Sequence, residues 1–408
     1  MKWTDTRLDR VASVQARIGW KALTADEYVE DGFVFLSTPN IKGRDIDFET
    51  VNYINQLRYE ESPELKLQEG DVLLAKDGST LGICNIVRAL PRPATVNGSI
   101  AVIRPHSIDP LYLRYYLESA TIRAQIDLMK NGMGVPHLFQ RDIKRFPLVV
   151  PSLQLQRQIA AFLDTQVARI DEIIRLRREQ MIAVEERTGA ELESLLVTPW
   201  DSFEPLRKLT DPTRPIQYGI VLVGPEYAGG VPVIVAGDIG GQRLFLDELK
   251  RTAPEIDALY PRSRVRAGDL VMAIRGSVGA VAVVPDALAG VNITREVARI
   301  APTVCDPGWL CAVLTTPFIQ HRIAEIAGGA AVQGVTIRDL RRVMVPVAPL
   351  DAQAKLGVSA AEILSKRDES RILMREEIAL LQERKRSLIT AAVAGEFDVT
   401  TASGRGVA

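Results

Sequence analysis

The sequence predicts a mixed α/β (α+β) protein in which two similar globular domains are joined by two long helices. Three observations predict this fold. The two halves of the 408-residue chain align with each other at an offset of about 198 residues. About 150 residues of each half are short apolar runs separated by Gly, Pro, Asn and Asp, as in strands and turns. About 45 further residues of each half lack proline and repeat apolar side chains every three or four positions, as long amphipathic helices do.

The internal repeat is supported by matching segments that occur in the same order in both halves. Such collinear matches over about 140 residues indicate a tandem duplication. We therefore expect two copies of one fold, related by an approximate two-fold axis. The clearest matches are Gly70-Asp71 with Gly268-Asp269, Gly78-Ser79 with Gly276-Ser277, and residues 141–145 with residues 338–342.

The globular domains are expected over residues 1–150 and 200–348. Their apolar runs are short enough for strands and are bounded by turn-forming residues. The Gly-Asp pairs at 70–71 and 268–269 are interpreted as turns that lead into strands. Strands are expected at 72–75, 100–103 and 281–284, and shorter helices at 111–126 and 309–326.

The long helices are expected over residues 151–199 and 349–396, each after a proline-marked edge. At 1.5 Å per residue, each would be a rod of roughly 65–70 Å. A single rod would expose its apolar stripe, so the two are expected to pack as an antiparallel coiled coil. Polar residues interrupt the stripes at Arg177, Arg367, Ser370 and Lys385. They are interpreted as register-setting imperfections or, alternatively, as docking points for other subunits, and residues 397–408 are expected to be a tail.

Composition and charge exclude several classes of protein. Residues 1–150, 151–200, 201–348 and 349–408 have net charges of 0, −2, +1 and 0, so no segment is a strongly basic nucleic-acid binder. No apolar run is long enough for a membrane helix, and the charged start is unlike a signal peptide. Cys84, Cys305 and Cys311 form no CxxC pair, which favours reduced core thiols and a cytoplasmic location.

The motifs of common enzymes are missing. The sequence has no phosphate-binding GxxxxGK[ST] loop, no dinucleotide-binding GxGxxG, no HExxH and no GxSxG elbow. It also lacks the glycine-rich cofactor loop and the Asn/Asp-Pro-Pro-aromatic motif of amino-methyltransferases. Three scattered His and three scattered Cys offer no metal-ligand spacing. We therefore expect a non-catalytic protein with no cofactor or metal of its own.

Several segments resemble the specificity subunit of type I restriction–modification enzymes. The turns that open the long helices, Pro151-Ser152-Leu153-Gln154-Leu155-Gln156 and Pro349-Leu350-Asp351-Ala352-Gln353, are similar to the turns of that family. The two Gly-Asp…Gly-Ser segments resemble its target-recognition domains, and residues 388–397 (LITAAVAGEF) resemble its C-terminal end. The second helix departs from the family pattern at residues 354–357, where Gly357 is expected to weaken the helix start.

The resemblance implies a function and a set of partners. Each globular domain would be a target-recognition domain that reads one half of a bipartite, asymmetric target in double-stranded DNA. The coiled coil would set the spacer between the half-sites. It would also dock two methyltransferase subunits and, through them, two motor–nuclease subunits. S-adenosylmethionine, ATP and Mg would be bound by those partners, and the chain would serve DNA methylation and phage defence.

Candidate DNA-contacting residues are polar side chains of types that pair with base edges or phosphates. Arg262, Arg264 and Arg266 alternate and are interpreted as one face of a strand that tracks phosphates. The candidates of the first half are Lys42, Arg44, Lys76, Ser79, Thr80, Asn131, His137 and Gln140. Those of the second half are Arg243, Arg262, Arg264, Arg266, Arg275, Ser277, Asn292, Thr294, Arg295 and Gln333.

Two other functions are the alternatives, of which the scaffold fits the same features and the nuclease lacks the catalytic motifs. A non-enzymatic coiled-coil scaffold would bind protein or another polymer through its two globular domains. A nuclease acting alone would cut DNA in the presence of a metal. Salt-sensitive, sequence-specific DNA binding that appears with a methyltransferase partner would distinguish the specificity subunit from the scaffold.

Overall fold

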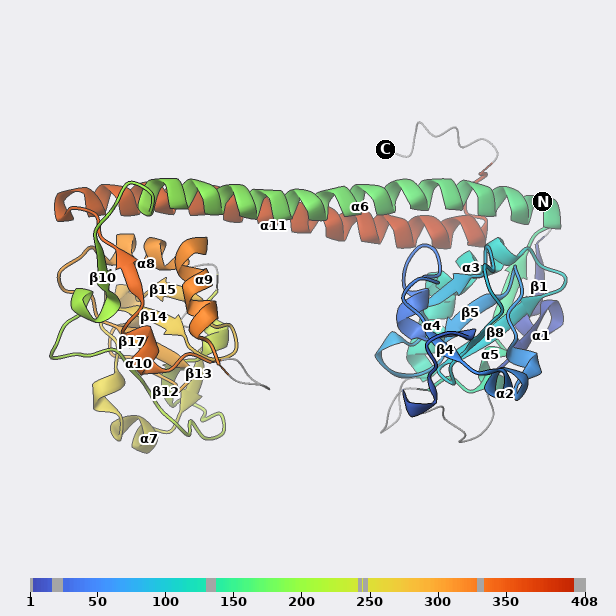
Figure 1. The fold of residues 1–408 in the computed structure, drawn as a ribbon. Helices are drawn as coiled ribbons and strands as arrows, with labels where there is room; N and C mark the ends of the chain where they lie inside the picture. The colour runs from blue at the N-terminus through green and yellow to red at the C-terminus, as the bar shows by residue number, and fades with distance from the viewer. Residues whose placement is uncertain are drawn as a thin grey trace. The chain divides into compact units, whose positions relative to one another are not determined.

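The computed structural model describes residues 3–16, 25–129, 137–240, 244, 249–328 and 334–399. The chain forms two compact units (Figure 1). The first contains Met1–Arg177 and Glu376–Ala408, and the second contains Arg178–Arg375. Two long helices, α6 (Leu153–Leu196) and α11 (Leu350–Ala394), each contribute residues to both units.

The globular part of the first unit contains two main sheets. Four strands run in the order β2-β8-β5-β6, and three run in the order β4-β3-β7, in which β3 and β7 are parallel. A two-stranded pair, β1-β9, closes the domain next to α6. The strands are β1 Thr4–Arg7, β2 Ala12–Gln15, β3 Phe33–Leu36, β4 Asn52–Ile54, β5 Val72–Ala75, β6 Cys84–Ile86, β7 Ala94–Val96, β8 Ile100–Pro105 and β9 Pro147–Val150. The helices are α1 Leu8–Val11, α2 Gln56–Glu60, α3 Pro110–Glu118, α4 Ala120–Met129 and α5 Gln140–Ile143, with 3-10 turns at Ala25–Glu27, Thr38–Ile41, Pro63–Leu65 and Gly78–Thr80.

The second unit repeats this topology strand for strand. Its sheets have the orders β11-β17-β14-β15, β13-β12-β16 and β10-β18, and β12 and β16 are the parallel pair. The strands are β10 Phe203–Pro205, β11 Gln217–Tyr218, β12 Val231–Ile234, β13 Lys250–Thr252, β14 Leu270–Ala273, β15 Val281–Val283, β16 Asn292–Ile293, β17 Val297–Ile300 and β18 Met344–Pro346. The helices are α7 Pro254–Ala258, α8 Pro307–Thr315, α9 Pro317–Ile326 and α10 Ile337–Leu340, with 3-10 turns at Leu206–Leu209, Ala236–Asp238, Pro261–Ser263 and Asp286–Leu288. The predicted fold class, two similar α/β domains with two long helices, is confirmed.

Each four-stranded sheet is buried on both faces. Val72 and Leu74 of β5 face a core that includes α3, α4 and the start of α6, whereas Leu73 and Ala75 face the three-stranded sheet. All four side chains are fully buried. The alternation follows from the two-residue period of a strand. In the second unit β14 is buried in the same way, so both central strands lack polar positions for a ligand.

Two helices differ from their expected extent. The helix expected over residues 111–126 is divided at Ser119 into α3 and α4. Ser119 has an extended backbone (ψ 155°), and its hydroxyl donates to the carbonyl of Tyr116. Serine side chains compete for backbone groups in this way and favour helix ends. The helix expected over 309–326 is divided likewise, because Pro317 begins a new helix.

A buried glutamine joins each long helix to its globular domain. The Gln156 side chain accepts from the Asp109 amide (2.9 Å) and donates to the Pro151 carbonyl (2.9 Å). In the second unit Gln353 makes the same two bonds, to Asp306 (2.8 Å) and to the Ala348 carbonyl (2.8 Å). Asp109 and Asp306 in turn cap α3 and α8. The glutamine of the helix-opening motif is therefore a structural link.

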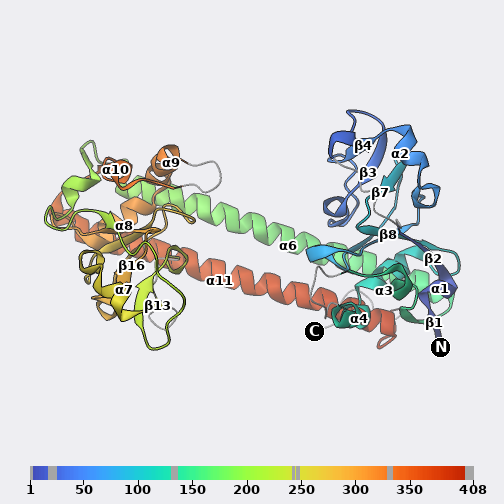
Figure 2. The same cartoon turned by 90° about the horizontal axis from the view of Figure 1, so that it is seen from below.

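Within each unit α6 and α11 pack antiparallel. In the first unit Asp171 pairs with Lys385 (2.8 Å) and Arg177 with Glu377 (2.8 Å), so the residue number rises along one helix as it falls along the other. In the second unit Glu185 meets Arg367 at 3.5 Å. Figure 2 shows the backbones of α6 and α11 side by side. Apolar residues repeat every three or four positions along α6 as expected, and five of them are buried: Ile159, Leu163, Val167, Ile170 and Ile174. Arg177, Arg367 and Lys385, which interrupt the stripes, thus form ion pairs between the helices.

Candidate nucleic-acid interface

In each unit, the loop after the central strand is tied to a later segment by the same backbone bonds. Leu138 donates to the carbonyl of Lys76 (2.8 Å), and Val335 donates to the carbonyl of Ile274 (2.9 Å). We call residues 76–80 with 137–140 the first loop pair, and residues 274–277 with 334–337 the second loop pair. Because backbone atoms hold both, the side chains are free to differ between the copies.

The first loop pair is largely internally bonded. The Nζ of Lys76, a residue only 6% exposed, lies 3.2 Å from Oδ2 of Asp77. The other carboxylate oxygen of Asp77 is bonded to Nδ1 of His137. Gln140 donates to the carbonyl of Val14, and Thr80 donates to that of Asp77 (3.3 Å).

Two side chains of the first loop pair face solvent. Ser79 is exposed, and Phe139 is 53% exposed with its ring edge-on to His137 at 4.6 Å. The guanidinium of Arg141 lies 5.0 Å from the centre of the Phe139 ring. An exposed aromatic beside a cation suits stacking or apolar contact with a base. The sequence reasoning missed Phe139, although its neighbours His137 and Gln140 were candidates.

Lys42 and Arg44 follow the 3-10 turn Thr38–Ile41 and are both exposed. Arg44 reaches Asp164 on α6 at 3.5 Å, where Arg88 also binds at 2.5 Å. Burial raises the pKa of Asp164, but the hydrogen bonds from Arg88 and Tyr115 outweigh it and keep the pKa below its ordinary value. Arg44 therefore helps to hold the globular domain against α6.

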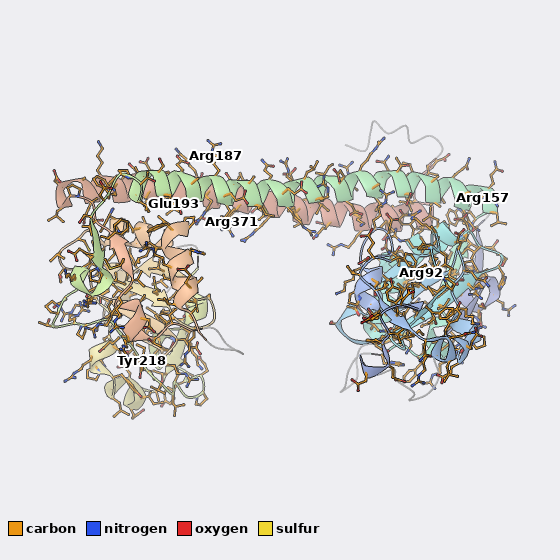
Figure 3. The ribbon with its side chains drawn as sticks, viewed as in Figure 1. Arg92, Arg157, Arg187, Glu193, Tyr218 and Arg371 are labelled. Atoms are coloured by element: carbon orange, nitrogen blue, oxygen red, sulfur yellow. The ribbon has the colours of Figure 1, made fainter. Side chains whose placement is uncertain are left out.

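The second loop pair lines a hollow of about 700 Å³. Its wall contains Arg275 and Arg295, both exposed, and Tyr218 of β11, which is 51% exposed. Tyr218 is labelled in Figure 3. Within the described residues, no ion pair is formed by either arginine. Ser277 donates to the carbonyl of Ala236 (3.2 Å). Two exposed guanidiniums and an aromatic ring make this hollow suitable for an anionic, base-bearing ligand.

A second, basic hollow of about 550 Å³ adjoins the first through Ile337. It is lined by Arg207, Arg338, Arg341 and Arg342, for which the described residues provide no carboxylate partner. Arg341 accepts a backbone bond from Arg207 (3.1 Å), which holds the two segments together. These arginines were not candidates, although the repeat of residues 141–145 at 338–342 contains Arg338, Arg341 and Arg342.

Asn292 and Thr294 lie in the interior. Asn292 is fully buried, donates to Asp257 (3.1 Å) and the carbonyl of Tyr260 (3.0 Å), and accepts from Ser263 (2.6 Å). Thr294 is 3% exposed. Burial argues against base contacts by either side chain in this conformation.

Arg262, Arg264 and Arg266 do not form a strand face as expected. Pro261 starts a 3-10 turn that contains Arg262, and the next residues are irregular up to the turn at Gly268. The turn at Gly268 requires a positive φ (80°), as does its counterpart Gly70 (89°). All three arginines nevertheless line one further hollow. The candidates Asn131, Arg243 and Gln333 lie outside the described residues.

The described residues contain no group of three His, Cys, Asp or Glu arranged as a metal site. Among the described helices, none combines the length and the apolar composition needed to cross a membrane. Burial raises the pKa of Cys84, Cys305 and Cys311 to about 12, so these thiols stay protonated and unreactive at neutral pH.

Residues 2–183 match the family described as the type I restriction modification DNA specificity domain. The EcoBI specificity subunit of Escherichia coli is 26% identical over 67% of this chain and 63% of its own length. The putative MjaX specificity subunit of Methanocaldococcus jannaschii is 22% identical over 91% of this chain and 88% of its own. A solved structure from work on assembly and conformational transition of the type I system aligns with a TM-score of 0.69 at 19% identity, covering 97% of this chain and 98% of that one. These matches confirm the resemblance predicted from the helix-opening motifs.

Proposed function

From this similarity to the specificity subunits of type I restriction–modification enzymes, we propose that the chain is the DNA-reading, non-catalytic subunit of such an enzyme. The observation that carries the proposal is the pair of loop sites held by matching backbone bonds but bearing different side chains. The first presents Ser79 and Phe139, and the second presents Arg275, Arg295 and Tyr218. Two different sites on one repeated scaffold fit a target whose two halves differ.

The arginines of the second unit fit contacts with DNA phosphates. Arg207, Arg338, Arg341 and Arg342 lie beside the hollow of the second loop pair. Phosphate contacts position a protein on DNA, whereas contacts with base edges select the sequence. We assign the phosphate role to these arginines and base reading to the two loop pairs.

The long helices would have two tasks. Their continuous backbones, Leu153–Leu196 and Leu350–Ala394, would set the spacer between the half-sites. Their exposed apolar side chains would dock the methyltransferase subunits, which bring the motor–nuclease subunits. Leu176, Ile182, Leu373 and Leu380 are between 49% and 65% exposed, unlike the buried stripe that joins the helices. S-adenosylmethionine, ATP and Mg would be bound by the partners.

A map of modified adenines in the source cell tests the function. Deleting the gene should abolish methylation at one split, asymmetric motif. Replacing it with the double variant Arg275→Gln, Arg295→Gln should weaken or alter recognition of one half of that motif only. The matched control Arg187→Gln, an exposed position on α6 (Figure 3), should leave the map unchanged. An unchanged map after deletion would contradict the proposal and favour the scaffold function.

A further inference from the structure

The second unit contains a hollow lined by five arginines. It has a volume of about 700 Å³, and Arg214, Arg262, Arg264, Arg266 and Arg299 all contribute to its wall. Arg214 pairs with Asp269 at 2.5 Å, and Arg264 pairs with Asp257. Within the described residues, Arg262, Arg266 and Arg299 form no ion pair, so the hollow has an excess of cations.

Arg299 is the unusual member of this group. It lies on β17, is 2% exposed, and its Nε has no hydrogen-bond partner. Its two Nη atoms donate to the carbonyls of Arg262 and Pro215 (the latter 3.0 Å). Burial and the proximity of Arg214 and Arg266 lower the pKa of Arg299 below its ordinary value. Asp269 and Asp211 offset this only in part, and neither forms an ion pair with Arg299. A buried guanidinium without a direct carboxylate partner is costly, and a bound anion would lower that cost.

The first unit has the same fold without the positive charges of Arg262, Arg266 and Arg299. The turn at Gln68–Asp71 has the same bonds as the turn at Arg266–Asp269: the Asp amide donates to the carbonyl three residues earlier, at 3.1 and 3.0 Å. At the repeat offset of 198 residues, Glu64 corresponds to Arg262 and Gln68 to Arg266. Val102 corresponds to Arg299, because each is paired with the equivalent residue of the central strand, Leu73 or Val271. The same fold is thus built with an acid, an amide and an apolar residue at these positions.

We propose that this hollow is a phosphate-binding site specific to the second unit, in which Arg262 and Arg266 contact the phosphate oxygens and Arg299 supplies charge at the base. Guanidiniums bind phosphate through paired, charge-assisted hydrogen bonds. The phosphate group comes either from the backbone of bound DNA or from a small soluble phosphate. The DNA source builds on the proposed function, whereas the soluble source is independent of it.

The test uses the full-length chain and the double variant Arg262→Glu, Arg266→Gln, which installs the residues of the first unit at two exposed positions. The variant Arg187→Gln is the control for the loss of an exposed arginine elsewhere. Calorimetry with inorganic phosphate and with pyrophosphate, without DNA, tests the soluble source. Anisotropy of a labelled duplex over a range of salt concentrations tests the DNA source.

Either source has its own expected result. Soluble phosphate would bind once per chain to the wild type and to the control, and at least about tenfold more weakly to the double variant. A DNA phosphate would instead be indicated if the variant lost about tenfold in duplex affinity and its salt slope fell by about 0.9 for each lost contact. Equal behaviour of the double variant and the control in both assays would overturn the proposal. Failure of the proposed function is a separate result, because it is measured by the methylation map of the deletion strain.

Discussion

Replacing Gly357 with alanine separates two opposing effects on stability. Gly357 lies inside α11, where alanine is favoured over glycine by about 1 kcal/mol in a helix. A Cβ at this position would lie 2.8 Å from the backbone nitrogen of Trp309 and 3.2 Å from Oδ1 of Asp306. Neither atom is free to move, because that Asp306 oxygen accepts from the same Trp309 nitrogen at 2.8 Å as the cap of α8.

Overpacking of a tight contact costs about 1–3 kcal/mol, so we expect Gly357→Ala to lower the free energy of unfolding by about 1 kcal/mol. The assay is urea unfolding, followed by circular dichroism and by tryptophan fluorescence, to which the buried Trp309 contributes. The variant Ala361→Gly, at an exposed position on the same helix, measures the propensity effect alone and should cost about 1 kcal/mol. If Gly357→Ala instead raised the stability by about the amount that Ala361→Gly loses, the contact with α8 would be refuted as the reason for the glycine.

Three further predictions concern the helix links, acid stability and DNA affinity. Gln156→Ala and Gln353→Ala should each lower the free energy of unfolding by about 1–3 kcal/mol, because a backbone amide and a carbonyl lose their hydrogen-bond partner. In the same urea assay the control Gln158→Ala, at an exposed position, should change it little. The pKa of Asp164 is lower in the folded state, so its contribution to stability is present above the unfolded pKa of 3.8 and is lost as the pH falls through the folded pKa. The urea midpoints at neutral pH and at about pH 3 should therefore differ less in Arg88→Gln than in the wild type. An equal difference would contradict the pairing. Arg341→Gln should weaken binding to duplexes of any sequence and reduce the salt slope by about 0.9, as one lost phosphate contact would; a change confined to one sequence would assign Arg341 to base reading instead.

The repeated fold was predictable because its signals are periodic and local. Apolar runs of strand length, proline-marked helix starts and three–four spacing all depend on neighbours in sequence. The breaks at Ser119 and Pro317 were not predicted from the apolar pattern, because that pattern continues across them. Gly357 was interpreted from helix propensity alone. Its close contact with Trp309 was not predicted, since Trp309 is far away in the chain.

The candidate site was less predictable because exposure and pairing are tertiary properties. Asn292 has the residue type of a base reader, yet its amide is used inside the domain. Lys76 is likewise buried beside Asp77. Arg299 was missed because it stands within the apolar run of β17, where a strand pattern gives no sign that its side chain meets other arginines.

Comparison of the two copies separates the residues that build the scaffold from those that face a ligand. The capping aspartates Asp109 and Asp306 and the linking glutamines Gln156 and Gln353 keep both their identity and their bonds. The residues that differ include those of the loop pairs and of the arginine hollow. Asp77, which neutralises Lys76 and binds His137 in the first copy, is replaced in the second by Arg275, which has no ion-pair partner among the described residues.

Since the loop pairs are held by backbone atoms, substituting their side chains leaves the bonds that position them intact. Under the proposed function, a new half-site specificity would therefore require changes in few residues and little loss of stability. A scaffold protein that docks the same partner through both domains would not need opposite charges at equivalent loop positions such as Asp77 and Arg275. A protein that reads two different half-sites would need such differences.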